Sequence, residues 1–348
     1  MINLFKMTTR IISLIFIIII TLSGCTEPES PELAVWVHGR ETTTSAEWDS
    51  LFSMMSEHGV RTALIGGNPT IIERAVNHAI PYHVNVQAWI WALNRGDAKP
   101  EWLSVNRKGW SLADSMAYVG YYKFMCPILP EARQFLKNKV LELSEIEGLQ
   151  AIHLDYIRYV DAILPVGLQP KYGLDQYEVF PEYDYGYHPA MLKAFEEEYG
   201  YNPLDRDAAN DTLWLQFRLD QVTTLVNEIV EEVHLSGKQL TAAVFPTPEM
   251  ATRMVRQQWN HWHLDRAYPM VYHNFYNEDN AWIEKVMKEN KAAVDFPVSC
   301  GLYLPAMKDS TEFVSAIQSA LRGGADGIAI FEAHGLKPWH WSYLKTLK

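Results

Sequence analysis

The sequence predicts an α/β fold of the (β/α)8, or TIM-barrel, class. Apolar strand-like segments alternate with amphipathic helix-like segments from residue 33 to the C-terminus, and the alternation contains eight strand–helix units. Such alternation implies parallel strands joined by crossover helices. A barrel of this class takes about 250 residues plus insertions, which fits the length available here. A doubly wound sheet is the alternative, but it would need a glycine-rich loop after its first strand, and HGRETTTS at residues 38–45 is not one.

The expected elements follow from the period of the apolar residues and from their flanking turn residues. The strand-like segments are residues 33–38, 60–65, 82–91, 149–156, 239–245, 264–272, 296–304 and 327–331. The helix-like segments are residues 45–58, 69–79, 130–146, 189–199, 213–234, 248–262, 281–291, 311–321 and 339–347, with Ser45 as a candidate N-cap of the first. The two long loops between them, 92–129 and 160–187, are expected to shape any cleft at the barrel mouth.

The first 32 residues are expected to lie outside the barrel. Lys6 and Arg10 precede an apolar run, 11–22, that is too short to span a bilayer comfortably. Leu22-Ser-Gly-Cys25 then resembles a bacterial lipobox, which predicts a signal peptide over 1–24 and lipidation of Cys25, with an uncleaved anchor as the alternative. Residues 25–32 read as a polar tether, and 33–348 as the barrel domain. This organisation predicts a lipid-anchored protein of the cell envelope, at the outer membrane if the cell is Gram-negative.

Charge and cysteine content narrow the possible partners. The chain carries 30 basic and 42 acidic residues, a net charge of −12, and removal of residues 1–24 takes away two basic residues and leaves −14. That balance disfavours nucleic acid, whose binding depends on phosphate neutralisation. Cys126 and Cys300 have no CxxC neighbour, so two buried thiols are favoured over one disulfide. No zinc pattern is present, and we expect no cofactor; the sequence does not indicate an oligomeric state.

Chemistry in such a barrel belongs at the carboxyl ends of the strands, and this sorts the acidic residues. Asp155 comes late in the fourth strand, Glu249 follows the fifth, and Glu332 directly follows the eighth. Asp265 and Asp326 stand at the starts of strands, so both are expected to cap the opposite face. Asp155, Glu332 and Glu249 are therefore the candidate catalytic residues.

Strand periodicity selects further side chains that point into the barrel. His153 and Asp155 lie two residues apart and therefore share a face, as do Trp89 and Trp91 on the third strand. A further alternating set ends the first strand: Trp36, His38 and Arg40. Flat aromatic rings stack on the apolar faces of sugars, and the chain has 12 Trp, 18 Tyr and 13 Phe. These residues predict a carbohydrate site, although Trp89 and Trp91 could instead pack under the next helix.

The hypothesis that follows is glycoside hydrolysis, which needs two carboxyl groups with unlike pKa values. Arg158 near Asp155 would keep that carboxylate ionised, as a nucleophile or electrostatic partner should be. Glu332, between Phe331 and Ala333, has the drier local sequence expected of an acid, and Glu249 has suitable topology. The alternative role for Asp155 is a buried salt bridge with Arg158.

The same segments resemble the glycosyl-hydrolase-like family 10 of bacterial lipoproteins and secreted proteins. Its strand-4 motif, HLDYIRYP, stands here as His153–Tyr159 with Val160 in place of the usual proline. Weaker likenesses lie in WLQFR at 214–218 with the helix 219–233, in AYPMVY at 267–272 and in ADGIAIF at 325–331. The resemblance extends from residue 33 to the C-terminus. It implies a (β/α)8 fold, glycan hydrolysis and, for some members, peptidoglycan glycan strands as substrate. It also implies that Asp155 is the leading catalytic residue, with Tyr156, Arg158 and Tyr272 in the pocket.

Two further functions remain open on sequence grounds. A glycan-binding lipoprotein on an inactive barrel would bind sugar without turnover. Metal-dependent deacetylation would need a metal site, for which His38 and His153 are the available histidines but have no convincing third ligand.

Overall fold

The computed structural model describes residues 30–348, and these form a (β/α)8 barrel, as predicted. Eight parallel strands pair in the order β6-β5-β4-β3-β2-β1-β8-β7. The ring is completed by two parallel bridges between β6 and β7, Ala267 to Val298 and Met270 to Gly301. The strands are β1 Glu32–His38, β2 Thr62–Gly66, β3 Asn85–Trp91, β4 Ala151–Asp155, β5 Gln239–Val244, β6 Arg266–Pro269, β7 Ser299–Tyr303 and β8 Gly327–Phe331.

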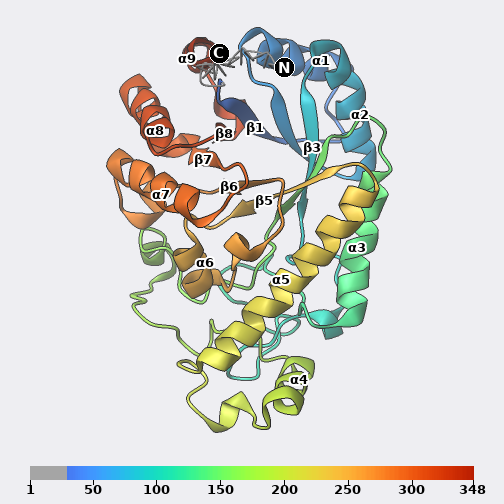
Figure 1. Cartoon of the computed structure of the whole chain (residues 1–348), viewed down its shortest axis with the longest axis vertical. Coiled ribbons are helices and arrows are strands. Elements are labelled where there is room, and N and C mark those ends of the chain that lie inside the picture. The colour runs from blue at the N-terminus through green and yellow to red at the C-terminus, as the bar shows by residue number, and fades with distance from the viewer. Residues whose placement is uncertain (1–29) are drawn as a thin grey trace, which may run out of the picture. The chain divides into compact units, whose positions relative to one another are not determined.

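Most of the helices surround this ring on its outer side (Figure 1). The helices are α1 Ser45–Glu57, α2 Pro69–Ala79, α3 Pro130–Ser144, α4 Pro189–Tyr199, α5 Thr212–Leu235, α6 Pro248–Val255, α7 Asn280–Ala293, α8 Ser310–Arg322 and α9 Pro338–Leu344. The large apolar core lies between the strands and the helices, because alternate strand residues such as Val35 and Val37 face outward. In the described residues, no helix is long and apolar enough to cross a membrane.

Several expected boundaries were wrong; β3, for example, begins at Asn85 rather than at 82, and β6 ends at Pro269 rather than at 272. α6 ends at Val255 rather than at 262, because Arg256 adopts a left-handed conformation with φ of 53°. The N-cap of α1 is Thr44, which forms a capping box with Glu47, rather than Ser45. Glu32, assigned to the tether, is the first residue of β1 and pairs with Gly327. The expected signal peptide and the lipidation site Cys25 lie outside the described residues.

Carboxylates at the amino ends of the strands stabilise the barrel, as predicted. Asp265 accepts the backbone N–H of Leu240, and Asp326 accepts that of Val298. Glu32 lies at the same end, where it accepts hydrogen bonds from Thr62 and Ser299 on neighbouring strands. These contacts replace backbone partners at strand ends, so this face is structural.

A chain of hydrogen bonds crosses the barrel interior, and it fixes the protonation of His153. Thr241 donates its hydroxyl to Gln87 at 2.7 Å, so its oxygen must accept from Nδ1 of His153, at 2.8 Å. His153 Nε2 is then the acceptor of the Trp36 indole N–H, at 3.3 Å. Burial lowers the pKa of His153 to about 3, so the ring is neutral.

The chain continues to the amino end of the strands through Tyr268. Gln87 Nε2 donates to the Tyr268 hydroxyl at 3.2 Å, and that hydroxyl donates to the Glu32 carboxylate. Every donor from Trp36 onward therefore points toward Glu32.

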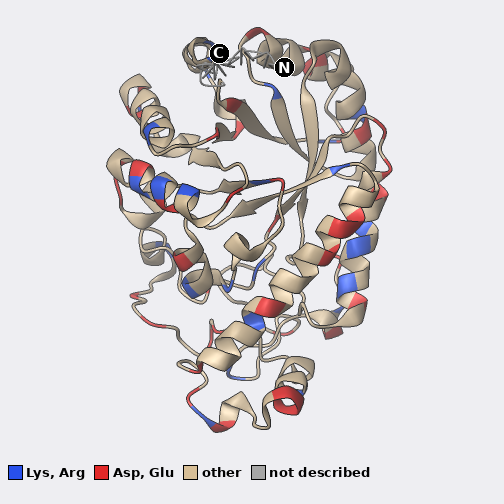
Figure 2. Cartoon of the chain, viewed as in Figure 1, with Lys and Arg blue, Asp and Glu red and all other residues tan. Residues whose placement is uncertain are grey.

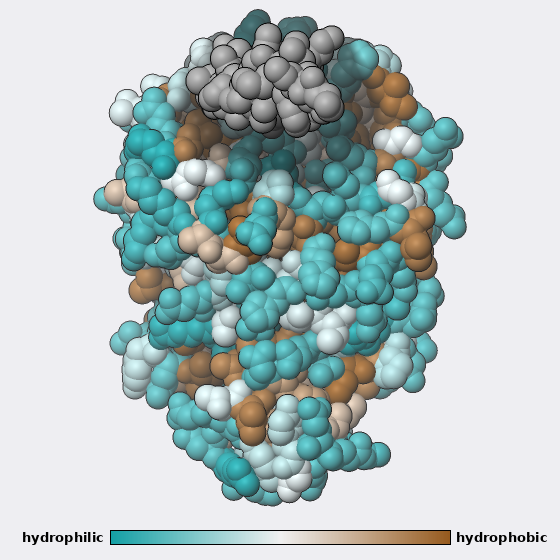
Figure 3. Space-filling model, in the orientation of Figure 1, coloured by the Kyte–Doolittle hydropathy of each residue, from teal (hydrophilic) through white to brown (hydrophobic). Residues whose placement is uncertain are grey.

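The outer surface carries both acidic and basic side chains, and one cluster of ion pairs joins α3 to α5. Acidic residues of α5 lie beside basic residues of α3 (Figure 2). Arg133 and Lys137 pair with Glu228 and Glu232 at 2.7 and 2.6 Å. The face in Figure 3 is mostly hydrophilic, with small hydrophobic patches between polar side chains.

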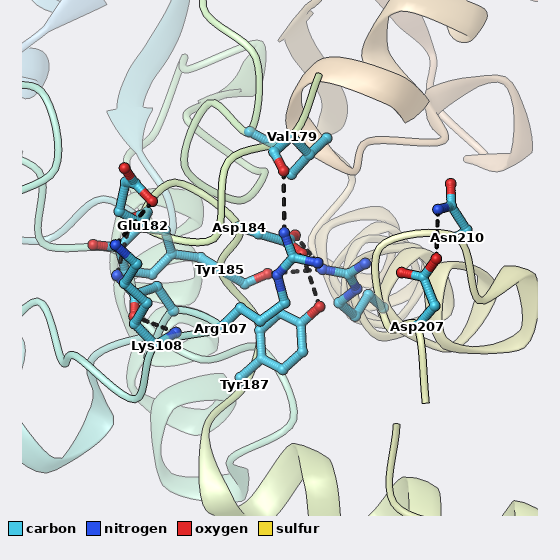
Figure 4. Close-up of polar contacts among 12 residues, drawn as sticks. Arg107, Lys108, Val179, Glu182, Asp184, Tyr185, Tyr187, Asp207 and Asn210 are labelled. Carbon is cyan, nitrogen blue, oxygen red and sulfur yellow. Dashed lines mark hydrogen bonds and ion pairs between the residues drawn. The ribbon is translucent and has the colours of Figure 1, made fainter. Parts of the chain in front are cut away.

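A buried aspartate holds the two long loops against α5. Asp184 accepts from Arg218 at 2.7 Å, from Tyr187 at 2.8 Å and from Arg256 at 3.3 Å, and Arg107 lies 3.6 Å away (Figure 4). Burial alone would raise the pKa of Asp184, but Arg218 and Arg256 outweigh burial and hold that pKa below its usual range. Arg107 comes from the β3–α3 loop and Asp184 from the β4–α4 loop, so one carboxylate fixes both.

The far ends of these loops pack on a separate small core. Phe195 and Trp214 meet edge to face at 5.1 Å, and Cys126 lies buried in the same cluster. α4 and the N-terminal end of α5 lie together in Figure 1 for this reason. Cys126 and Cys300 are both buried free thiols, as predicted.

Candidate active site

A cavity of about 400 Å³ opens among the carboxyl ends of the strands. This is the face at which barrel enzymes place their chemistry, and the volume lies within the usual range for ligand sites of about 300–1,000 Å³. Most of its wall is aromatic, with contributions from β1, β3, β4 and β8 and from both long loops. The aromatic side chains include Trp36, Trp89, Trp91, Tyr118, Tyr121, Tyr122, Tyr156, Tyr272 and Phe331.

Asp155, the last residue of β4, carries the accessible carboxyl group of this cavity. Its Oδ2 accepts the indole N–H of Trp89 at 3.0 Å, and its Oδ1 accepts the backbone N–H of Tyr156 at 2.7 Å. Tyr156 holds a left-handed conformation, with φ of 50°, which turns the chain sharply just after the carboxylate. Burial raises the pKa of Asp155 despite these two hydrogen bonds. The site therefore favours the protonated form more than an ordinary surface carboxyl would.

The expected relation between Asp155 and Arg158 was wrong. Arg158 pairs with Asp161 at 3.2 Å and donates to the backbone carbonyl of Tyr159 at 2.8 Å. Its guanidinium lies 5.1 Å from the ring centres of Tyr156 and Phe245, in cation–π contact. Arg158 is thus neutralised by Asp161 and lowers the pKa of Asp155 less than burial raises it. The alternative of a salt bridge between Asp155 and Arg158 is likewise not formed.

Arg158 and Asp161 join the walls of the cavity. Asp161 is only 3% exposed and also accepts the Tyr122 hydroxyl at 3.0 Å, while its backbone carbonyl accepts the Tyr118 hydroxyl at 2.8 Å. Both tyrosines belong to the β3–α3 loop and Asp161 to the β4–α4 loop. Arg158 and Asp161 also line the cavity, so the pair links its two walls, and Arg158 lies in the pocket as expected from the family resemblance.

The aromatic residues predicted on β1 and β3 do face the cavity. Trp36, His38, Trp89 and Trp91 all line it, so the alternative in which the two β3 tryptophans pack under a helix is wrong. The His38 ring lies 4.7 Å from that of Trp89. Trp91 is 38% exposed, with its ring in edge contact with Tyr156 at 4.9 Å. Tyr156 and Tyr272, expected from the family resemblance, line the same space.

Two predicted binding residues lie elsewhere. His153 is completely buried beneath the cavity, because its ring is held between Trp36 and Thr241. Arg40 follows β1 into a separate hollow formed with α1 and α9. Neither side chain lines the cavity, so neither is a direct sugar contact in this structure.

The two candidate glutamates differ sharply in position. Glu249 is exposed in the first turn of α6, away from the cavity lining, because the β5–α6 connection turns it outward. Glu332 directly follows β8, and its carboxylate lies 3.2 Å from His38 Nε2 and 3.7 Å from His334 Nδ1. The drier setting expected for Glu332 was wrong, since its side chain is 30% exposed and lies between two imidazole rings. Because His38 lines the cavity, Glu332 lies at its margin.

The histidines do not form the metal site that a deacetylase would need. His38 contacts Glu332 and Trp89, whereas His153 is bound inside the barrel. Within residues 30–348, no group of three or more His, Cys, Asp or Glu side chains is arranged to hold a metal ion.

Part of the lining could not be found from strand periodicity. Tyr118, Tyr121 and Tyr122 come from the β3–α3 loop, and Asp161 and Lys171 from the β4–α4 loop. The concentration of tyrosine in these loops was the only available signal, because loop paths depend on distant partners such as Arg218.

The sequence of most of the barrel matches a known protein family. A family model described as glycosyl hydrolase-like 10 matches residues 82–308. The chain belongs to this family. The matched region runs from the start of β3 past β7 and includes Asp155, and a search of curated proteins finds no match.

Solved structures similar to this family member include TIM-barrel glycosidases. The catalytic domain of a β-amylase from Paenibacillus polymyxa matches with a TM-score of 0.64 at 10% identity, covering 91% of this chain and 98% of that one. A β-N-acetylhexosaminidase matches at 0.52 and 12% identity, with 91% and 72% covered. An α-galactosidase from Lactobacillus brevis matches at 0.52 and 10% identity, with 91% and 40% covered. At these identities the likeness establishes the fold alone.

Proposed function

We propose that this protein is a glycoside hydrolase that cleaves an oligo- or polysaccharide at the mouth of its barrel. The observation that carries the proposal is Asp155, a carboxyl group with a raised pKa that projects into an aromatic cavity. A general acid must still hold its proton near the working pH, and burial in an apolar pocket is the usual means. The aromatic wall supplies stacking surfaces for pyranose rings.

In this mechanism Asp155 protonates the glycosidic oxygen as the bond to the anomeric carbon breaks. The developing positive charge on that carbon then needs a carboxylate, either as a nucleophile or as a base that activates water. Glu332 is the better candidate, because His38 connects it to the cavity and Glu249 lies outside. These roles reverse the assignment expected from the sequence.

The proposed substrate class follows from the strand-4 motif. Glycan strands of peptidoglycan are the first candidate, because some relatives with the same strand-4 motif are thought to act on them. One structural neighbour is titled a β-N-acetylhexosaminidase and another a β-amylase, and both names concern glycan cleavage.

We further propose that Cys25 is lipidated after removal of residues 1–24 and anchors the enzyme in the cell envelope. The lipobox Leu22–Cys25 supports this proposal. Two or more acyl chains hold a protein stably on a membrane. Metabolic labelling with a fatty-acid analogue should mark the wild type and not Cys25→Ser; label on the variant would reject the anchor.

The decisive experiment compares the wild type with Asp155→Asn on peptidoglycan glycan strands and on chito-, cello- and malto-oligosaccharides. Hydrolysis of one substrate by the wild type and its loss in the variant would support the proposal.

The second candidate is a glycan-binding barrel without turnover, which is favoured by the position of Glu332 outside the main cavity lining. Binding with no hydrolysis by the wild type would select that function.

A further inference from the structure

A second hollow lies beside the aromatic cavity and has no role in the mechanism above. This groove has a volume of about 410 Å³ and runs over the carboxyl ends of β1, β2 and β3. His38, Trp89 and Trp91 line both spaces, so these three side chains form the boundary between them. Trp91, Gly96 and Asp97 are exposed, so the groove opens to solvent.

Trp89 is the contact between the two hollows. On the cavity side its indole N–H binds Asp155. Its six-membered ring lies against Gly66 of the groove, where an added Cβ would come within 2.8 Å of Trp89 Cε3. A saccharide chain that passes over Trp89 and Trp91 would therefore have Asp155 within its length rather than at its end.

The groove wall has the polar groups that sugar hydroxyls bind. Arg95 holds Asp97 in a two-point ion pair, at 2.8 and 2.7 Å, and donates to the Trp91 carbonyl at 3.1 Å. Planar side chains of this kind, beside a tryptophan face, offer directional donors and acceptors together with a stacking surface. Gly39, Gly66 and Gly67 contribute only backbone atoms to the lining, which leaves room above the strand ends.

Asn94 provides an independent sign that a ligand belongs here. It lines the groove, is 1% exposed, and its Oδ1 accepts the backbone N–H of Lys123 at 2.8 Å. Its Nδ2 has no hydrogen-bond partner among residues 30–348. A buried amide donor without a partner is costly, and a small shift of this amide toward the groove would let a sugar hydroxyl accept from it and relieve that cost.

We propose that this groove is a second saccharide-binding subsite, separated from the aromatic cavity by Trp89 and Trp91. The inference rests on the proposed glycosidase function and adds to it that the enzyme acts within a glycan chain. Sugar units bind on both sides of the scissile bond, one side in the aromatic cavity and the other in the groove.

Gly96 allows the groove to be filled without disturbing the fold. A Cβ at this position meets no atom within 4 Å, and the backbone is not left-handed. Gly120 is the matched control, because it is exposed, lines neither hollow, and a Cβ there meets only the Met116 sulfur at 3.9 Å. Gly96→Trp and Gly120→Trp should therefore unfold at the same temperature as the parent.

The test measures binding in the Asp155→Asn background, so that no substrate is consumed. Calorimetry with chito-, cello- and malto-oligosaccharides of two and six units should give tighter binding of the hexamer in at least one series. Gly96→Trp should lower the affinity for that hexamer about tenfold and leave the dimer within about twofold, whereas Gly120→Trp changes neither.

The subsite would be overturned if Gly96→Trp and Gly120→Trp bound the hexamer with equal affinity. It would also be overturned if no hexamer bound in any series. This test is independent of the catalytic proposal, because it measures binding in a variant that does not turn substrate over. A wild type that hydrolyses nothing while Gly96→Trp still weakens hexamer binding would reject the hydrolase and retain the groove.

Discussion

Trp89 donates its indole N–H to Oδ2 of Asp155 at 3.0 Å, and the two side chains come from neighbouring strands of the barrel. This bond stabilises the ionised carboxylate and opposes the rise in the Asp155 pKa that burial causes. Trp89 therefore tunes the proposed acid and also orients it in the cavity.

Replacing Trp89 with Phe should move the pH dependence of hydrolysis. Loss of the donor raises the pKa of Asp155 further, so a general acid would stay protonated to higher pH. The alkaline limb of the pH profile of kcat/KM should therefore move to higher pH than in the wild type and in the control Trp110→Phe, whose site is exposed. A limb that stays in place in Trp89→Phe would show that Asp155 does not set it.

Asp155→Asn should lower kcat by about 10²–10⁴-fold, the usual contribution of a positioned general acid. The fold should survive, since the Asn amide oxygen can still accept from Trp89 or Tyr156. Activity assays paired with circular dichroism check this expectation. A folded variant with an unchanged rate would remove Asp155 from the mechanism.

The two glutamates offer a matched comparison. Glu332→Gln should reduce kcat by about 10²-fold or more, because Glu332 is the proposed partner carboxylate beside His38. Glu249→Gln should leave kcat unchanged, because Glu249 is exposed on α6 and outside the cavity lining. The reverse ranking in steady-state kinetics would contradict the assignment.

His153 should make the fold sensitive to acid. Its pKa in the folded state is about 3, below the ordinary value of 6.5, so the unfolded chain takes up the proton first as the pH falls. Stability is therefore lost as pH drops from about 6.5 toward about 3, by up to about 5 kcal/mol at about 1.4 kcal/mol per unit. Denaturant titrations at several pH values measure this slope.

His153→Gln should flatten that slope, whatever its effect on absolute stability. The exposed His263→Gln should keep the wild-type slope. If the free energy of unfolding depended on pH in the same way in both variants, a group other than His153 would cause the acid sensitivity.

Asp184→Asn should destabilise the folded chain by about 3–5 kcal/mol, because it leaves buried arginines without their carboxylate. The control Lys193→Ala removes an exposed pair with Glu197 and should cost no more than about 0.5 kcal/mol. Urea unfolding distinguishes the two, and equal midpoints would mean that the Asp184 cluster carries little stability.

The barrel was predictable because the order of residues within each strand shows which side chains face inward and which face outward. Alternation in residues 33–38 separates the inward Trp36 from the outward Val35 and Val37, and the same period placed Trp89, Trp91 and Asp155 on the cavity side. Such local signals need no knowledge of distant residues.

The local environment of the site was less predictable for a physical reason. Arg158 stands three residues from Asp155 in sequence, yet its guanidinium turns to Asp161 and to the rings of Tyr156 and Phe245. Glu332 has apolar sequence neighbours but meets His38 from another strand. In each case a partner brought by the fold outweighs the neighbours in the chain.

The position of Glu32 separates the start of the barrel domain from the candidate site. β1 starts at this residue on the face where Thr62, Ser299 and Tyr268 surround its carboxylate, and the cavity opens at the other ends of the same strands. The barrel domain therefore begins at the face opposite the cavity. The full length of the barrel thus separates the Glu32 carboxylate from a ligand bound in the cavity.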